Sequence, residues 1–408
     1  MELRPILSAM RRNKVGAILI GVQMAITLAI LCNALFIIEQ RIALSKRPTG
    51  TDESSIFVIS NQWVGNAPDL AAKLRADLAA LRSMPGVIDA VASNSFPLHN
   101  GGSTEAIKLN PEQKDESALT ALYFADEHGL QAFGLKLVAG RNFNADEVLD
   151  KEGYTDLTPP TAVIITRTLA DKLFPGKSAL GQSIYFEGVP KQVPIVGVVD
   201  RFQVPWTQAG GWGSKFNDNS TIMPFRFVFP YAHYIVRVQP GQLVAVMKAA
   251  EKTLIEVDRA RVLQKTETLT AARADAYKDD RGLVVILCVV CGALVAVTAF
   301  GIVGLTSYWV TQRRRQIGIR RALGATRKAI LRYFQTENFL IAAAGSAVGI
   351  GLALCLNLWM VTTFEMERLH ASYAIIGAII VLLLSQLASL WPALKAASIP
   401  PALATRAA

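Results

Sequence analysis

Residues 312–338 read QRRRQIGIRRALGATRKAILRYFQTEN. The stretch carries eight basic residues and one acidic residue, Glu337, and a long uncharged apolar run lies on each side of it. Short loops between membrane spans keep an excess of lysine and arginine on the cytoplasmic side. The pattern therefore indicates a cytoplasmic loop between two transmembrane helices.

Four apolar runs of the chain contain no Asp, Glu, Lys, Arg or His, and they cover residues 15–38, 283–310, 339–364 and 371–394. At 1.5 Å per residue, about 24 helical residues reach roughly 36 Å, which exceeds the roughly 30 Å hydrocarbon core of a bilayer. We therefore predict an α-helical membrane protein with four transmembrane helices. The first run is too long for the apolar part of a signal peptide, so we interpret it as a retained anchor.

The formal net charge of +10 lies on one side of this predicted membrane. Residues 1–14, 311–338 and 395–408 together hold fourteen basic and two acidic residues, whereas residues 39–282 hold 27 basic and 28 acidic residues. This is the positive-inside distribution and not the basic surface of a nucleic-acid-binding protein. We expect both termini inside, a large domain outside over 39–282, and a short outer loop over 365–370.

The outer domain begins and ends with a strand–helix–strand pattern. Strand-forming residues at 56–60 and 87–91 flank a helix with Leu70, Leu74, Leu78 and Leu81 on one face, and the same order recurs over 234–265. We predict a large α/β domain with two βαβ units, at 50–91 and 230–268, a β-rich insert over about 92–229 and a helical stalk over 270–282. Residues 206–220, rich in Gly, Asn and Trp, predict an exposed loop.

The residue patterns indicate neither catalysis nor a metal site. Gly176-Lys177-Ser178 is similar to the end of a phosphate-binding loop, but Asp171 stands where that loop needs glycine. The four histidines are isolated in the sequence, and all four cysteines lie in the apolar runs. The absence of ionisable side chains from the runs disfavours an ion-coupled carrier.

Two interpretations of the loop at 312–338 remain open on these grounds. One is a solvated basic loop that only fixes the topology. In the other, Ile319 and Leu323 lie on one face of a short helix that Gly324 ends, and Thr326 caps a second helix that carries Ile330, Leu331 and Phe334. Two helices joined by a glycine turn would form a rigid lever at the membrane surface.

The loop resembles the signature of the MacB/FtsX-like permeases of ABC transporters, in which an R-E-I-G-I-R-R-A-L-G-A pattern joins the second and third spans. Residues 317–325 match the pattern, Gln316 replaces its Glu, and Glu337 matches the acid that opens the third span. The tail from Pro392-Ala393 to Pro400-Pro401-Ala402-Leu403 resembles the closing pattern of the family. Gly140-Arg141-Asn142-Phe143, residues 162–176, Gly181-Gln182 and residues 195–199 resemble the MacB-type periplasmic core domain.

This resemblance implies a bacterial inner-membrane permease whose outer domain is periplasmic and whose βαβ units form a porter-like subdomain. It implies an ATPase-docking coupling helix made of Arg315, Gln316, Ile317, Gly318, Ile319, Arg320, Arg321, Ala322, Leu323 and Gly324. It also assigns Arg327, Lys328 and Glu337 to the lead-in to the third span.

The implied function is that of a permease subunit in an ATP-driven export complex, which passes ATPase motion to the periplasmic domain by mechanotransmission. The expected partners are a separate ABC ATPase that binds ATP and Mg, a second permease as dimer, a periplasmic adaptor, an outer-membrane channel and membrane lipid. Because the chain begins almost directly with its first span, we expect no fused ATPase, no cofactor on this chain and no enzymatic activity of its own. The alternative is a permease-like regulatory protein that controls a periplasmic enzyme or sensor without moving cargo.

Overall fold

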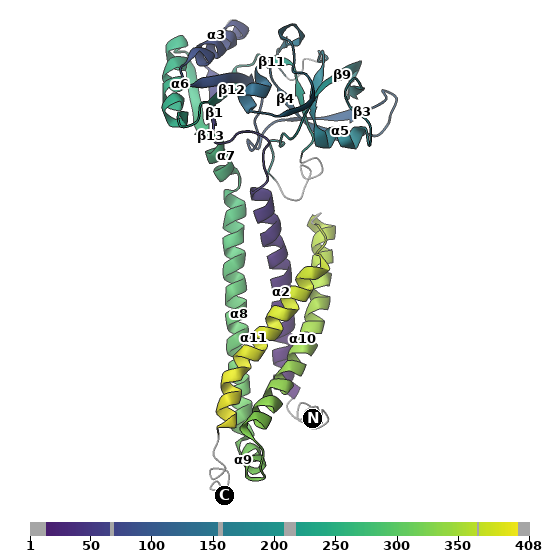
Figure 1. Ribbon diagram of the computed structural model, residues 1–408, viewed down its shortest axis with the longest axis vertical. Coiled ribbons are helices and arrows are strands. Elements are labelled where there is room, and N and C mark those ends of the chain that lie inside the picture. Colours follow the sequence, from purple (N-terminus) through teal and green to yellow (C-terminus); the bar gives the residue numbers. More distant parts are fainter. Residues whose placement is uncertain (1–13, 66–68, 154–157, 208–217, 365–366, 399–408) are drawn as a thin grey trace. The chain divides into compact units, whose positions relative to one another are not determined.

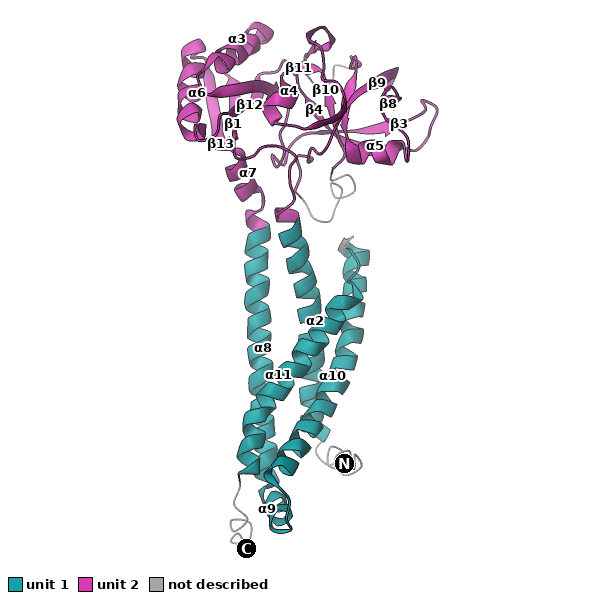
Figure 2. Ribbon diagram, viewed as in Figure 1, with its two compact units in different colours: residues 1–43, 280–408 teal, residues 44–279 magenta. Residues whose placement is uncertain are grey.

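The computed structural model describes residues 14–65, 69–153, 158–207, 218–364 and 367–398 (Figure 1). The chain forms two compact units (Figure 2). Residues 1–43 and 280–408 belong to the helical unit, and residues 44–279 form the α/β unit.

The helical unit contains four helices that are long and apolar enough to cross a membrane. They are α2 (Lys14–Ser45), α8 (Lys278–Gln312), α10 (Arg327–Phe364) and α11 (Ala371–Ala397). A short helix, α9 (Arg314–Ala322), lies between α8 and α10 in the chain. The predicted lead-in and third span therefore form one continuous helix, α10, because nothing between Arg327 and Phe364 breaks the helical hydrogen bonding.

Helix α2 packs against the other three long helices. A Cβ added at Gly345 or Gly349 of α10 would lie within 2.9 Å of a backbone oxygen of α2, so these glycines allow the two backbones to approach closely. The Thr27 hydroxyl bonds to Thr298 of α8 at 2.8 Å, and Asn33 donates to the Ala353 carbonyl of α10 at 3.1 Å. Gly345 and Gly349, four positions apart, thus serve packing within one chain.

The α/β unit is built on a four-stranded sheet, with the order β13-β1-β12-β2 and antiparallel neighbours. Its elements are β1 (Ile56–Trp63), α3 (Leu70–Ser83), β2 (Val87–Ser93), β12 (Tyr231–Val238), α6 (Leu243–Val257) and β13 (Arg261–Thr268). In each strand–helix–strand unit a strand of the other unit lies between the two parallel strands. This is the split βαβ arrangement of ferredoxin-like folds, and it confirms the two predicted βαβ units.

The two faces of this sheet bury different cores. Leu74, Leu78 and Leu81 of α3 and Ala250 and Leu254 of α6 pack on one face. Ile56, Val58, Val91 and Ile235 project from the other face into a core that they share with the insert. The insert is therefore fixed to the sheet by a continuous apolar core.

The insert is β-rich, as the sequence predicts. Its strands are β3 (Ser103–Lys108), β4 (Ala118–Phe124), β5 (Leu137–Gly140), β6 (Leu149–Lys151), β7 (Val163–Thr166), β8 (Ser183–Phe186), β9 (Val189–Val199), β10 (Ser220–Met223) and β11 (Phe225–Phe227). Its helices are α4 (Gly129–Phe133), a 3-10 turn at Ala145–Glu147 and α5 (Arg167–Leu173). Seven strands form a sheet in the order β5-β9-β7-β10-β4-β3-β8, and β9 also pairs with β8. The sheet therefore closes on itself.

The prediction of an exposed loop over 206–220 is wrong at both described ends of that stretch. Thr207 is buried and Trp206 packs against the shared core. Asn219 is also buried, and Ser220 begins the fully buried strand β10. Residues 208–217 lie outside the described residues. The indole of Trp206 and the hydrogen bonds of Asn219 and Ser220 outweigh the turn-forming composition.

Helix α7 (Leu269–Ala276) follows β13 and ends at Tyr277, and α8 begins at Lys278. The Thr268 hydroxyl caps α7 by accepting from the Ala271 amide at 3.1 Å. The side chain of Arg273 on α7 binds Glu53 at 2.6 Å and the carbonyl oxygens of Ser45 and Arg47. This ion pair fixes α7 to the first residues of the α/β unit.

Candidate functional site

The predicted coupling helix at 315–324 and the lead-in that follows it form a helix, a turn and the start of a second helix in the helical unit. Helix α9 ends at Leu323, and Gly324 follows with a φ of 97°, a left-handed conformation that favours glycine. Thr326 caps α10 by accepting a hydrogen bond from the Ala329 amide at 3.2 Å. The glycine turn and the cap therefore lie where the sequence predicts them.

One face of α9 is anchored by an apolar cluster. Ile317 is 5% exposed and packs with Ile330 and Phe334 of α10. The same cluster includes Val310 of α8 and three alanines near the end of α11, Ala393, Ala396 and Ala397. Helix α9 is thus seated on the ends of three long helices, as its position in Figure 1 also shows.

Two interactions of arginine strengthen this seat. Arg313, the residue before α9, forms an ion pair with Glu337 of α10, in which Nη1 donates to both carboxylate oxygens at 2.8 and 3.0 Å. The guanidinium of Arg320 lies over the Tyr333 ring, 5.1 Å from its centroid. Such cation–π contacts attract through the ring quadrupole. Both contacts hold α9 against α10.

The opposite face of α9 is exposed and combines apolar with basic side chains. Ile319 is 50% exposed and Leu323 is 83% exposed. Among the other predicted docking residues, those exposed to solvent are Arg315, Gln316, Arg320, Ala322 and Gly324, and Arg321 is half-buried. Arg327 and Lys328 are exposed at the start of α10. A surface with an apolar centre and a charged rim has the composition of a protein interface.

Three of the predicted site residues do not belong to this exposed surface. Ile317 and Gly318 face inward, and Glu337 is 2% exposed in its pair with Arg313. Arg313 was absent from the predicted site although it orients the helix. Its partner lies 24 residues along the chain, and only the packing of α9 on α10 brings the two together.

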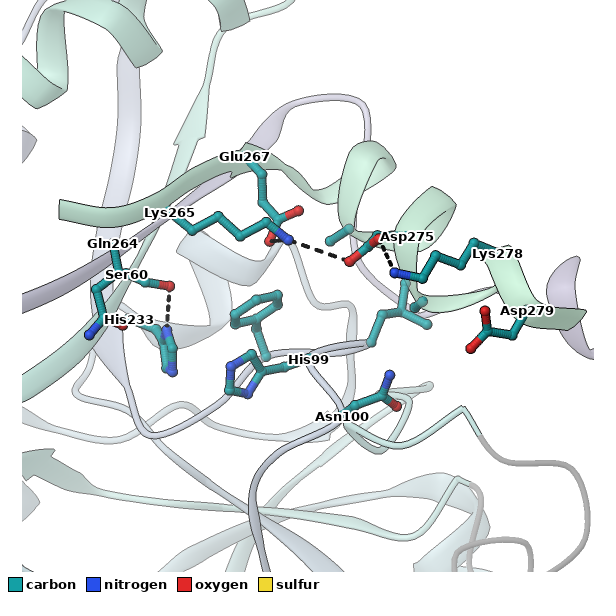
Figure 3. A pocket seen from close by; sticks show the side chains of 14 residues that line it. Ser60, His99, Asn100, His233, Gln264, Lys265, Glu267, Asp275, Lys278 and Asp279 are labelled. Atoms are coloured by element: carbon teal, nitrogen blue, oxygen red, sulfur yellow. Dashed lines mark hydrogen bonds and ion pairs between the residues drawn. The ribbon is translucent and has the colours of Figure 1, made fainter.

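A second constellation in the α/β unit escaped prediction, because its members are far apart in the sequence. The rings of His99 and His233 meet with centroids 4.4 Å apart, at a cleft of about 480 Å³ (Figure 3). The His233 ring is hydrogen-bonded to Ser60 at 3.0 Å. Burial and the neighbouring His99 lower the pKa of His233 to about 3, and burial also lowers the pKa of His99.

Four charged side chains of this cleft pair with one another. Lys265 contacts Glu267 at 2.8 Å and Asp275 at 3.6 Å, and Lys278 contacts Asp275 at 3.2 Å (Figure 3). Within the described part of the chain, no group of three His, Cys, Asp or Glu side chains is arranged to hold a metal ion. The histidine pair therefore belongs to a neutral, buried contact beside a network of ion pairs.

Family comparisons agree with the geometry of both units. The model of the MacB-like periplasmic core domain matches residues 15–254, which is more than half of the chain, and the model of the FtsX-like permease C-terminal region matches residues 288–401. The chain is a MacB/FtsX-like permease. It is therefore a membrane protein of the ABC-transporter permease type with a periplasmic domain.

The permease is similar in sequence to macrolide export ATP-binding/permease proteins MacB. The protein from Neisseria gonorrhoeae is 26% identical over 302 residues, which cover 70% of this chain and 42% of that protein. The protein from Burkholderia cenocepacia is 25% identical over 350 residues, which cover 81% of this chain and 46% of that protein. The chain thus spans less than half the length of these relatives.

Among solved structures, the permease is similar to the extracellular domain of the noncanonic ABC-type transporter YknZ from Gram-positive bacteria. The identity is 18% and the TM-score 0.32, with 51% of this chain and 100% of that chain covered. It is also similar to the periplasmic region of MacB from Actinobacillus actinomycetemcomitans, with 12% identity, a TM-score of 0.35 and coverage of 57% and 97%.

Proposed function

We propose that the permease is a subunit of an ATP-driven export complex and that α9 is its coupling helix. A separate ABC ATPase docks on the exposed face of α9 from the cytoplasm and binds the ATP and Mg that drive transport. The observation that carries this proposal is the two-sided character of α9. Ile317 fixes one face to three long helices, while Ile319 and Leu323 present apolar surface on the other.

The contacts that hold α9 against the long helices make mechanotransmission physically reasonable. A force on Leu323 acts on a helix held by a buried ion pair and an apolar cluster, so α9 moves as one body with the start of α10. Protein interiors are close-packed and compress little, so a displacement at one end of such a packed contact is passed to the other. Two permeases, each with its own ATPase, would close together when ATP binds.

We propose the remaining partners of the complex from the similarity to the MacB proteins, which are named as export proteins. The periplasmic domain engages a periplasmic adaptor that leads to an outer-membrane channel. Substrate then leaves from the periplasm and need not cross the four helices. The absence of ionisable side chains from the four apolar runs supports a force-transmitting role for these helices.

The test removes the apolar centre of the docking face without changing the charge that sets topology. In the double variant Ile319→Ser/Leu323→Ser, we expect an ABC ATPase to be lost from the affinity-purified permease, together with ATP-dependent export. The matched control is Val244→Ser/Ile255→Ser on α6, where both side chains are also exposed at 59% and 46%. Retention of the ATPase by the α9 variant, at the level of the control, would contradict the assignment.

A further inference from the structure

A small cavity lies in the closed sheet of the insert. Its volume is about 260 Å³, and residues of strands β3, β4, β6, β8, β9, β10 and β11 line it. The apolar lining consists of Leu122, Phe124, Phe186, Val189, Met223 and Phe225, and five of these side chains are buried in the core of the insert. The cavity is somewhat smaller than the roughly 300–1,000 Å³ that drug-sized ligands occupy. It therefore suits a small, largely apolar molecule.

Two carboxylates, Glu105 and Glu187, line the same cavity. Glu105 on β3 lines the cavity, and it is half-buried. Burial raises the pKa of Glu105, a hydrogen bond from the Ala106 backbone partly offsets this rise, and the nearby Glu187 adds to it. Within the described residues no ion pair involves Glu105. A partly desolvated carboxylate next to another carboxylate is unfavourable, and a bound cation would relieve both costs.

The other charged groups of the cavity, Glu187 and Lys151, have partners of their own. Glu187 is exposed and pairs with Lys108 at 3.4 Å. The ammonium of Lys151 lies over the Phe225 ring, 4.8 Å from its centroid. Lys151 is not among the groups that shift the pKa of Glu105, although both side chains line the cavity. The cavity therefore has an acidic end at Glu105 and a basic wall at Lys151, which disfavours a ligand with two positive charges.

We propose that this cavity binds a small apolar monocation, of the alkylammonium or arylalkylammonium class. The ammonium group bonds to Glu105, and the hydrocarbon part packs among Phe124, Phe186 and Met223. This inference is independent of the docking of an ATPase on α9, since it concerns the insert of the periplasmic domain alone.

The test compares 2-phenylethylammonium with its neutral analogue 2-phenylethanol, each titrated into the purified full-length permease by calorimetry. We expect the ammonium to bind at least about tenfold more tightly than the alcohol, because a charge-assisted hydrogen bond is stronger than a neutral one. In Glu105→Gln this preference should disappear while the alcohol binds as before. Unchanged binding of the alcohol shows that the variant still forms the cavity.

Two further measurements sharpen the assignment. The affinity for the ammonium should fall as the pH drops through the raised pKa of Glu105, whereas the affinity for the alcohol should stay constant. The control Glu112→Gln, an exposed position of the same insert, should bind both molecules like the unmodified chain. Equal affinity for the two molecules, equal binding of the ammonium by Glu105→Gln, or no saturable binding of either molecule would overturn the proposal.

Discussion

The Arg313 guanidinium lies 2.8 Å from the Glu337 carboxylate, and the two side chains are only 12% and 2% exposed. The pair connects the residue before α9 to the point where α10 becomes apolar. A carboxylate at this depth needs its partner, since an unpaired buried charge is far more costly than a paired one. The ion pair therefore holds α9 and α10 together.

Breaking this pair should loosen α9. We expect Arg313→Gln or Glu337→Gln to destabilise the seat of α9 by about 3 kcal/mol, and the double variant to be less affected because it leaves no uncompensated charge. Hydrogen exchange of residues 314–322 in the purified permease measures the effect. The control Arg332→Gln, exposed on α10, should leave the exchange unchanged. Single variants as protected as the unmodified chain would show that the pair does not fix α9.

A second buried ion pair stabilises the periplasmic domain. Arg261 binds Asp77 of α3 through two hydrogen bonds of 2.7 and 2.8 Å, both side chains are fully buried, and the Tyr234 hydroxyl donates to the same carboxylate. We expect Asp77→Asn to lower the stability of this domain by about 3–5 kcal/mol, measured by chemical denaturation.

The surface pair Lys252–Glu256 on α6 offers the matched control, because its side chains are 80% and 65% exposed. We expect Lys252→Ala to change stability by less than about 1 kcal/mol. Similar losses in Asp77→Asn and Lys252→Ala would refute a special role for the buried pair.

The histidine contact predicts a pH dependence of stability. The pKa of His233 is about 3 in the folded permease, whereas an unfolded histidine has a pKa of about 6.5. Between these pH values, His233 is protonated in the unfolded chain but not in the folded chain. Its contribution to the free energy of unfolding is therefore unchanged above about pH 6.5, and stability falls as the pH drops towards 3.

Hydrogen exchange of β12, measured from pH 7 to pH 4.5, is the suitable readout, since most carboxylates stay ionised over that range. After correction for intrinsic rates, protection should decline in the unmodified permease and decline less in His233→Gln. The exposed His370→Gln serves as control and should behave like the unmodified chain. An equal decline in both variants would assign the effect to other groups.

The glycines of α10 provide a test of the packing in the helical unit. A Cβ at Gly349 would lie 2.9 Å from the Ala25 carbonyl oxygen, whereas a Cβ at Gly351 would meet nothing within 4 Å. We therefore expect Gly349→Val to lower the thermal stability of the detergent-solubilised permease and Gly351→Val to have little effect. If both variants melt at the same temperature, close contact of α2 and α10 is not what stabilises this unit.

Much of the fold follows from local patterns in the sequence. Uninterrupted apolar runs can only be long helices in a bilayer, and the spacing of Leu70, Leu74, Leu78 and Leu81 places α3 on its sheet. The glycine turn and the threonine cap of the coupling segment are likewise local signals, because φ at Gly324 and the bond of Thr326 depend on neighbouring residues. Such features can be predicted without knowing the tertiary structure.

Other features depend on contacts between distant residues and were not predictable. The closure of the insert requires β9 to pair with β8 at its start and with β7 further along, which no local pattern encodes. The partners His99 and His233 are 134 positions apart, and Arg313 meets Glu337 only because Ile317 seats α9 on α10. The burial of Thr207 and Asn219 shows that a turn-like composition does not establish exposure.

The central claim is that a separate ATPase contacts the exposed face of α9. Site-specific photocrosslinking in native membranes tests it most directly, with a benzophenone amino acid placed at Leu323, which is 83% exposed, and a control at Val244 of α6. Our account predicts an adduct with an ABC ATPase from position 323 and none from position 244. Membranes that contain the assembled complex but yield no ATPase adduct from position 323 would contradict it.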